Sequence, residues 1–389
     1  MRTPRRFLLI LAIAAFAGTS ALLEFSLARA WGRSPDTADH RIWIPSSAVV
    51  NPADYAGTQV CAECHSPVYE QQNTNPMASS AMRPAESPYL RQPGISFTQG
   101  AYTYSISNQG GRVFLTVSDS QRKITMPVVL VFGAGVVHQL FLLQHNDHYH
   151  LSRVSFYTTT GKLEQWANAP PELPTSLEAA LGQIFPDENI RNCFHCHNAL
   201  GVVGDHFDMT RAFPGTQCET CHGPGARHVA AMRAGNLENT FIVNPAHLSP
   251  SEELDFCGAC HSSPRQHGTT AQSVKSGDLR GVRTVLCQPY RFMSSRCWNS
   301  ADARSRCTFC HDPHLPVVHE SAAYDAKCLA CHVSEVSAAP RADQPGKACP
   351  VGKHECASCH MPPTDVPGTR LSFTDHKIRI ARPGEPYPD

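Results

Sequence analysis

Apolar and polar residues alternate along two neighbouring segments, 102–106 and 113–117, and the sequence Asn-Gln-Gly-Gly lies between them at 108–111. Alternation with a period of two is typical of a strand with one buried face, and an Asn- and Gly-rich connection is typical of a hairpin turn. Further apolar or alternating runs follow at 128–132, 138–143 and 154–156. The pattern predicts an antiparallel β subdomain over residues 95–165.

The first thirty residues have the pattern of an export signal. Arg2, Arg5 and Arg6 precede an uncharged, mostly apolar run at 7–23, and Ala-Arg-Ala at 28–30 offers a cleavage site. We expect residues 1–30 to be a cleaved signal peptide and the protein to be periplasmic or otherwise extracytoplasmic. The alternative is an uncleaved N-terminal anchor, with 7–23 as a membrane tether, because this run is at the lower length limit of a membrane span.

The composition of the 389-residue chain is balanced except in cysteine and histidine. The 33 Lys and Arg equal the 33 Asp and Glu, and 41% of the residues are apolar, which excludes a disordered tail and gives no electrostatic sign of nucleic-acid binding. The chain also has 17 Cys and 21 His. A chain of this length buries a core without a disulfide framework, so the Cys and His call for a joint explanation.

The sequence Cys-x-x-Cys-His occurs seven times, and we call each copy a haem word. In chain order, words 1 to 7 are Cys61, Cys64, His65; Cys193, Cys196, His197; Cys218, Cys221, His222; Cys257, Cys260, His261; Cys307, Cys310, His311; Cys328, Cys331, His332; and Cys356, Cys359, His360. This is the signature of c-type haem attachment: the two thiols bind one haem covalently and the adjacent His becomes the proximal iron ligand. The sequence predicts seven covalently attached haems c.

Two other kinds of site use paired cysteines. Zinc sites combine Cys-x-x-Cys pairs, but they do not require a His directly after the second Cys. Thioredoxin-like redox pairs need one motif between a strand and a helix, not seven. Haem attachment explains the complete set.

The chain after residue 165 has little periodicity, and Pro and Gly interrupt it. The predicted fold is mainly short α-helices and loops packed around c-type haems, with an antiparallel β subdomain inserted after the first haem motif. The predicted domains are 1–30, the signal peptide or anchor; 31–94, the first haem-binding segment; 95–165, the antiparallel β subdomain; and 166–389, the hexahaem-binding region. Because the haems would supply much of the core, we expect the last region not to fold without them.

Three cysteines lie outside the words: Cys287, Cys297 and Cys349. In an oxidising compartment Cys287 and Cys297 would be able to close a small disulfide loop. The alternative is buried thiols that pack as small apolar residues. The sequence leaves both open.

The fourteen histidines outside the words are enough to give every iron a second imidazole. Two axial His ligands suit electron transfer, whereas an enzymatic haem needs an open or weakly held position. His228 follows word 3 across a Gly-Pro-Gly turn, His314 lies three residues after His311, and His376 has Asp375 beside it. Each is a candidate distal ligand, His228 and His314 for a neighbouring haem, and an ordinary surface His is the alternative.

Two further histidine contexts are weaker. The segment 145–150, His-Asn-Asp-His-Tyr-His, is a metal or ligand candidate, but Asn-Asp between apolar runs is also a turn signal, which we favour. His206 lies between words 2 and 3 and is a further distal candidate.

The segments around words 3, 5 and 7 resemble the multihaem cytochromes c related to hydroxylamine oxidoreductase. They read Cys-Glu-Thr-Cys-His-Gly-Pro-Gly before His228, Cys-Thr-Phe-Cys-His-Asp-Pro-His ending at His314, and Cys-Ala-Ser-Cys-His-Met-Pro followed by Thr-Asp-His at 374–376. The tetrahaem electron acceptor of that enzyme and octahaem tetrathionate reductase belong to the same broad group. The resemblance implies closely packed haem pairs, with His228, His314 and His376 as distal ligands. The segment 133–139 is similar to a Gly-rich segment with His in some relatives, which makes His138 a candidate as well.

The chain departs from the group after word 1. Some relatives have a His there, whereas this chain has Met77 and Met82. Either Met would raise the potential of the first haem as its sixth ligand. The alternatives are a Met that fills an apolar gap, or a first haem left open.

These observations predict an exported heptahaem cytochrome c that transfers electrons between redox partner proteins. Removing residues 1–30 takes away four of the 33 basic and one of the 33 acidic residues, leaving 29 against 32, and seven haems add roughly −7 through their propionates. We therefore expect partners to dock through a basic patch, and no nucleic acid. The alternative function is a multihaem reductase or oxidase of small nitrogen or sulfur compounds at one five-coordinate haem, although no catalytic residue outside the haem histidines is recognisable.

Overall fold

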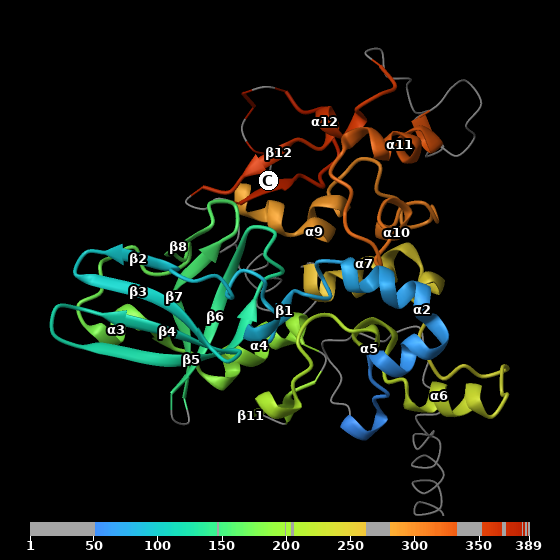
Figure 1. Cartoon of the computed structure of the whole chain (residues 1–389). Helices are drawn as coiled ribbons and strands as arrows, with labels where there is room; N and C mark the ends of the chain where they lie inside the picture. The colour runs from blue at the N-terminus through green and yellow to red at the C-terminus, as the bar shows by residue number, and fades with distance from the viewer. Residues whose placement is uncertain are drawn as a thin grey trace, which may run out of the picture. The chain divides into compact units, whose positions relative to one another are not determined.

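The computed structural model describes residues 51–145, 148–198, 200–203, 206–261, 281–332, 352–367, 371–382, 384, 385 and 387 (Figure 1). The predicted signal peptide at 1–30, the apolar run at 7–23 and Cys349 lie outside these residues. No helix among the described residues is long and apolar enough to cross a membrane.

The largest element is an antiparallel sheet of nine strands (Figure 1). Its strands are β1 (Ala81–Met82), β2 (Ser96–Gln99), β3 (Tyr102–Gln109), β4 (Arg112–Ser118), β5 (Lys123–Phe132), β6 (His138–His145), β7 (His148–Tyr157), β8 (Lys162–Gln165) and β9 (Gly182–Ile184). Strands β2 to β8 are neighbours in chain order, while β1 pairs with β5 and β9 pairs with β7. The predicted hairpin is present as β3 and β4, where Tyr104 pairs with Val117.

The sheet curls until its two end strands nearly meet. Strands β2 and β8 contact each other, and Gln99 donates a side-chain hydrogen bond to Gln165. The register shifts between Val128 and Leu130 on β5 and between Leu140 and Leu142 on β6. Such irregularities bend a strand and increase its twist, which explains how the sheet becomes nearly closed.

Ten α-helices are described, most of them short. They are α2 (Thr58–Thr74), α3 (Leu177–Leu181), α4 (Asp187–His197), α5 (Cys218–His222), α6 (Ala226–Arg233), α7 (Pro250–His261), α9 (Gln288–Met293), α10 (Cys307–Cys310), α11 (Asp325–His332) and α12 (Cys356–His360). Among them run 3₁₀ turns, η3 (Pro52–Asp54), η4 (Pro84–Glu86), η5 (Met209–Arg211), η6 (Pro245–His247), η7 (Gly281–Leu286) and η8 (Ser321–Tyr324). Two-stranded pairs are formed by β10 (Val202–Val203) with β11 (His206–Phe207) and by β12 (Pro363–Asp365) with β13 (Ser372–Thr374).

Apolar side chains cover both faces of the curled sheet. One buried cluster includes Tyr104, Leu115 and Phe141, and a second includes Leu142 together with Phe194 of α4. Because consecutive residues of β6 belong to different clusters, the strand reads as a continuous apolar run. Helix α4 carries word 2, so this second cluster attaches a haem word directly to the sheet.

The prediction of a fold made mainly of short helices and loops is wrong. The sheet, whose strands extend from Ala81 to Ile184, supplies both large buried clusters, and α2, α4 and α7 have 17, 11 and 12 residues. The sequence pattern missed the extent of the sheet because β1 and β9 have only two and three residues, too few to show alternation.

Candidate functional site

Each haem word lies at the end of a helical turn. Helices α4, α5, α7, α11 and α12 end at the histidines of words 2, 3, 4, 6 and 7. Helix α10 ends one residue before His311, and α2 leaves helical geometry at His65, two residues before Pro67. Residues three apart lie on one face of a helix, so the two thiols of each word project from the same side. The seven words therefore share one local geometry.

The cysteines of the haem words differ in exposure from Cys287. All fourteen are partly or fully exposed, whereas Cys287, which belongs to no word, is completely buried. Burial raises the pKa of Cys193 and of Cys310 to about 11, which keeps them as thiols at neutral pH. This exposure fits attachment of a haem at each word.

Three histidines that follow haem words lie opposite the histidines of other words. The ring centroids are 6.3 Å apart for His65 and His228, 6.1 Å for His222 and His314, and 6.2 Å for His311 and His376. A metal–imidazole bond of about 2 Å on each side places two axial nitrogens about 4 Å apart and the ring centroids about 6 Å apart. The spacing of all three pairs therefore fits one haem iron between two imidazoles.

Backbone carbonyls orient four of the imidazoles. The Nδ1 atoms of His222, His228, His360 and His376 lie 2.9, 2.8, 2.8 and 2.9 Å from the carbonyl oxygens of Val243, Thr240, Arg379 and Thr374. When Nδ1–H donates to a carbonyl, Nε2 keeps its lone pair for a metal. Burial lowers the pKa of His222, and it lowers the pKa of His376 to about 4. Both rings are thus neutral at pH 7, the form that binds iron.

A buried ion pair holds the segment that carries His376. Asp375 accepts hydrogen bonds of 2.9 Å from both Nε and Nη2 of Arg291, and one of 2.8 Å from Arg379. Arg291 and Asp375 are completely buried. The backbone carbonyl of His376 accepts a further bond of 3.0 Å from Ser295. Asp375 thus anchors the backbone, while the Nδ1 of His376 bonds to the carbonyl of Thr374.

The remaining word histidines have different surroundings. His197 lies edge-on to Phe132 with centroids 5.6 Å apart, and His261 bonds to the side chain of Gln288. Among the described residues, the histidines of words 2, 4, 6 and 7 have no imidazole ring contact like those of the three pairs, although His261 interacts electrostatically with His311 and His376. A cavity of about 590 Å³ lies between the segments 78–88 and 210–217. The second of these segments contacts word 2, since the N–H of Gly215 donates to the carbonyl of His197.

His138 lies at the start of β6. Burial lowers its pKa, its ring centroid is 5.4 Å from that of Tyr157, and its Nδ1 is buried without a hydrogen-bond partner. The structure does not place it opposite a word histidine. It does not bring His138 together with the other candidates.

The structure places a histidine ring, not a methionine, opposite His65. Met82 is buried in the first cluster of the sheet, where its sulfur accepts a hydrogen bond of 3.5 Å from Gln139. The Met77 carbonyl accepts from Thr216. The ring opposite His65 is His228, so the geometry at word 1 is that of two histidines.

The structure also places the remaining cysteine and histidine candidates. The structure contains no disulfide between Cys287 and Cys297, and Cys297 lies beside the thiols of word 6. His145 and His148 pair across β6 and β7, in agreement with the turn interpretation. His206 lies in β11.

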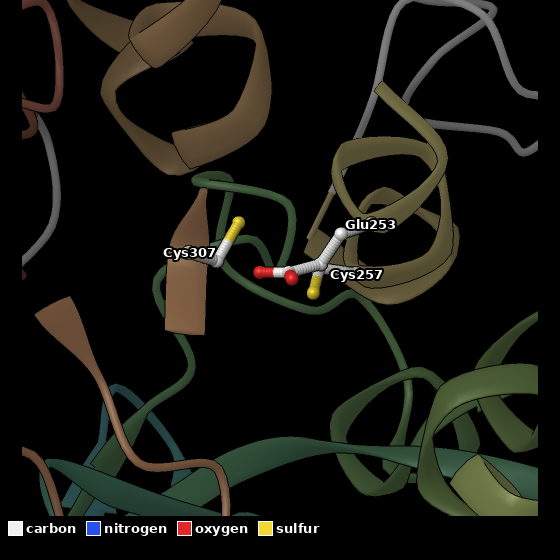
Figure 2. Close-up of side chains that lie close together, drawn as sticks. All are labelled: Glu253, Cys257 and Cys307. Carbon is white, nitrogen blue, oxygen red and sulfur yellow. The ribbon is translucent and has the colours of Figure 1, made fainter. Parts of the chain in front are cut away.

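One group of side chains has the composition of a metal site. Glu253, Cys257 and Cys307 place their ligand atoms within 4.8 Å of one another (Figure 2). Both thiols belong to haem words, so the group reflects how words 4 and 5 pack together.

Sequence reasoning missed four buried charged residues beside the words. Besides Arg291, these are Glu219, Glu253 and Asp325, which are 3%, 1% and 7% exposed. Each acid lies within or just before a word, but at a different offset from the first cysteine, so no fixed spacing marks it.

Comparisons with known proteins agree with the haem words. The family model "Cytochrome c554 and c-prime" matches residues 147–223, which include words 2 and 3. Multiheme cytochrome MtrA of Shewanella baltica (strain OS185) is 23% identical over 177 residues, 41% of this chain and 51% of the relative. The chain thus spans about half the length of this curated relative. The crystal structure of outer cell wall cytochrome OcwA covers 84% of this chain and 80% of its own, with 16% identity and a TM-score of 0.48.

Proposed function

We propose that this chain, a multihaem cytochrome of the c type, carries seven haems and transfers electrons between redox partners along them. The three facing imidazole pairs carry the proposal. Each pair combines the histidine of one word with a histidine that follows another word, so the iron sites connect segments far apart in sequence. Two axial imidazoles saturate an iron and favour outer-sphere electron transfer over substrate binding.

Each haem would be held by the two cysteines and the histidine of its word, and it would supply one-electron iron chemistry. His228, His314 and His376 would be the distal ligands of words 1, 3 and 5. His138 remains a proposed distal ligand, supported by its buried Nδ1 without a partner. The resemblance to the hydroxylamine oxidoreductase group is part of the proposal.

Location and partners follow from the same proposal. The basic and apolar pattern of residues 1–30 supports a protein outside the cytoplasm, either after cleavage or tethered through 7–23. Its partners would be redox proteins rather than nucleic acids.

Replacing His314 by alanine tests the ligand assignment. We expect one ferric haem to change from low spin to high spin, because word 3 loses its second imidazole. The mass of the protein should still correspond to seven attached haems. Electron paramagnetic resonance and mass spectrometry measure the two quantities. His319→Ala is the matched control, because His319 is exposed in the same segment. A wild-type spectrum for His314→Ala would contradict the assignment.

An enzyme remains the second candidate function. Within the described residues, the histidines of words 2, 4, 6 and 7 have no imidazole ring contact like those of the three pairs, and a cavity lies close to word 2. A high-spin ferric signal of the unaltered protein that shifts with nitrite or hydroxylamine would favour a reductase or oxidase. Low-spin signals alone would favour the electron carrier.

Salt should slow electron transfer from a basic donor. With about −1 for each haem and an acidic mature chain, the protein should attract a basic patch over a distance that shrinks with ionic strength. We expect the rate of reduction by a basic donor to fall at least about tenfold between 10 and 500 mM salt in stopped-flow experiments. A rate that does not depend on salt would argue against electrostatic docking.

A further inference from the structure

A buried carboxylate joins haem words at three places in the described chain. In each case the acid is on or beside the helix of one word and accepts at least one backbone N–H bond from a residue within two positions of the start of another word's helix. The three acids are Glu219, Glu253 and Asp325.

Glu219 lies inside word 3 and binds the start of α2, which carries word 1. Its Oε1 accepts from the N–H of Ala56 at 2.7 Å and its Oε2 from the N–H of Gly57 at 2.9 Å. The N–H of Gly225 donates a third bond of 2.7 Å to Oε1. Words 1 and 3 are thus tied together by one side chain that is 3% exposed.

Glu253 reaches from α7, before word 4, to the start of α10, which carries word 5 (Figure 2). Its two oxygens accept from the N–H and the hydroxyl of Thr308 at 2.8 and 3.0 Å. Arg306 lies 3.3 Å from the same carboxylate and neutralises part of its charge.

Asp325 begins α11, which carries word 6, and binds the start of α12, which carries word 7. It accepts from the N–H groups of Glu355 and Cys356, both at 2.9 Å. These bonds lower the pKa of Asp325, so it is ionised at neutral pH.

The thiols of the same words also meet. Side chains lie within hydrogen-bonding reach for Cys61 and Cys218, Cys257 and Cys307, and Cys328 and Cys356. Each pair of words that an acid joins therefore has a thiol contact as well: word 3 with word 1, word 4 with word 5, and word 6 with word 7. Word 2 has a thiol contact too, between Cys196 and Cys260 of word 4, but none of the three acids joins it, and its helix packs against the sheet.

Each carboxylate is placed to act as a fixed anion. Backbone N–H donors at or just before the start of a helix stabilise a negative charge, and burial reduces its screening by water. Reduction of a haem adds an electron, which a nearby anion opposes. The effect should be largest for Glu219, which accepts three N–H bonds and has no ion-pair partner among the described residues.

We propose that Glu219, Glu253 and Asp325 organise six of the haem words into three pairs and that each carboxylate lowers the midpoint potentials of the pair it joins. The proposal rests on the function proposed above, because it assumes that the words carry haems. It assigns these acids as positioning residues that also tune the electron route.

The test is Glu219→Gln in the full-length holoprotein, followed by spectroelectrochemical titration. Glutamine keeps an acceptor oxygen but removes the charge. We expect two of the seven potentials to rise, each by about a tenfold change in the equilibrium constant for reduction, or about 59 mV for one electron. Haem mass and low-spin signals should stay unchanged.

Glu63→Gln is the matched control. Glu63 lies inside word 1, but it is exposed and pairs with exposed Arg233 at 2.8 Å. Its replacement removes the same charge and should leave the potentials nearly unchanged, because water screens it. Equal shifts in both variants, or a uniform shift of all seven haems, would overturn the proposal.

Asp325→Asn gives a second, independent measurement if Glu219→Gln does not accumulate. It should raise two other potentials, those of words 6 and 7, and the double variant should show both sets of shifts, because distant sites add. Failure of the proposed function would be distinguishable, since the protein would then lack haem mass. Haem-loaded variants with unchanged potentials would contradict only the pairing proposal.

Discussion

Arg291→Met is expected to release His376 from the haem of word 5 and to change that haem from low spin to high spin. The guanidinium is the principal partner of Asp375, and Asp375 fixes the backbone on which His376 lies. Removing one member of a buried ion pair costs about 3–5 kcal/mol when the other charge is left without a partner, and the bond of 2.8 Å from Arg379 to Asp375 offsets part of that cost here. The carbonyl of His376 keeps its bonds from Ser295 and from the N–H of Ile378, and we expect these neutral bonds to be too weak to stop the segment from detaching locally.

Two measurements separate ligand loss from general unfolding. Electron paramagnetic resonance should show one new high-spin ferric haem, while chemical denaturation followed by circular dichroism should report the lost stability. Arg233→Met is the control, because it breaks an ion pair whose side chains are 65% and 58% exposed, and such a pair contributes at most about 1 kcal/mol. Arg291→Met protein with only low-spin haems would show that Asp375 does not position His376.

Low pH should weaken the attachment of the His376 segment through Asp375. Burial alone would raise the pKa of Asp375, but the bonds from Arg291 and from the N–H of Lys377 outweigh it and lower the pKa. A carboxyl with a lowered pKa stabilises the fold above its unfolded pKa of about 3.9, and this contribution disappears as the pH falls through the folded value. In a pH titration the word 5 haem should therefore remain low spin at pH 5 and become high spin well below pH 4. In Asp375→Asn the change to high spin should already be present at pH 5.

The candidate chemistry can be proposed from the sequence because it depends on adjacent residues. Each haem word lies within five residues, and the β3–β4 hairpin is formed by neighbouring segments with a short turn. His228 and His314 are candidate distal ligands because the turns before them direct each side chain away from the haem of the preceding word. The turns do not reveal which word histidine each would face.

The long-range part of the site has no such pattern. Arg291 and Asp375 are 84 residues apart, and Glu253 and Thr308 are 55 apart. Their contacts depend on how complete helices pack, and a charged residue in sequence is far more often exposed than buried. The same limit explains why the predicted fold class is wrong, because β1 and β9 join the sheet through backbone hydrogen bonds that no side-chain pattern indicates.

Without haem, the protein is expected to keep its sheet and lose the region that follows. The first buried cluster of the sheet contains no residue of a haem word. After Phe213, by contrast, the described chain has few buried apolar residues: Ala231, Val243, Leu248, Leu254, Val285, Cys287 and Val366. Burial of these few side chains cannot offset the conformational entropy that is lost when such a long segment is ordered. The haems must therefore supply most of the apolar contacts.

Expression in a host without haem-attachment machinery tests this asymmetry. Limited proteolysis of the apoprotein should leave a fragment close to residues 81–184 and digest the chain beyond Phe213, whereas the holoprotein should resist over its whole described length. Mass spectrometry identifies the fragment, and circular dichroism should retain the strand signal. A protease-resistant apoprotein beyond Phe213 would mean that side chains alone stabilise the haem region. Complete digestion would mean that the sheet depends on word 2, whose helix α4 contributes Ile190 and Phe194 to the second cluster.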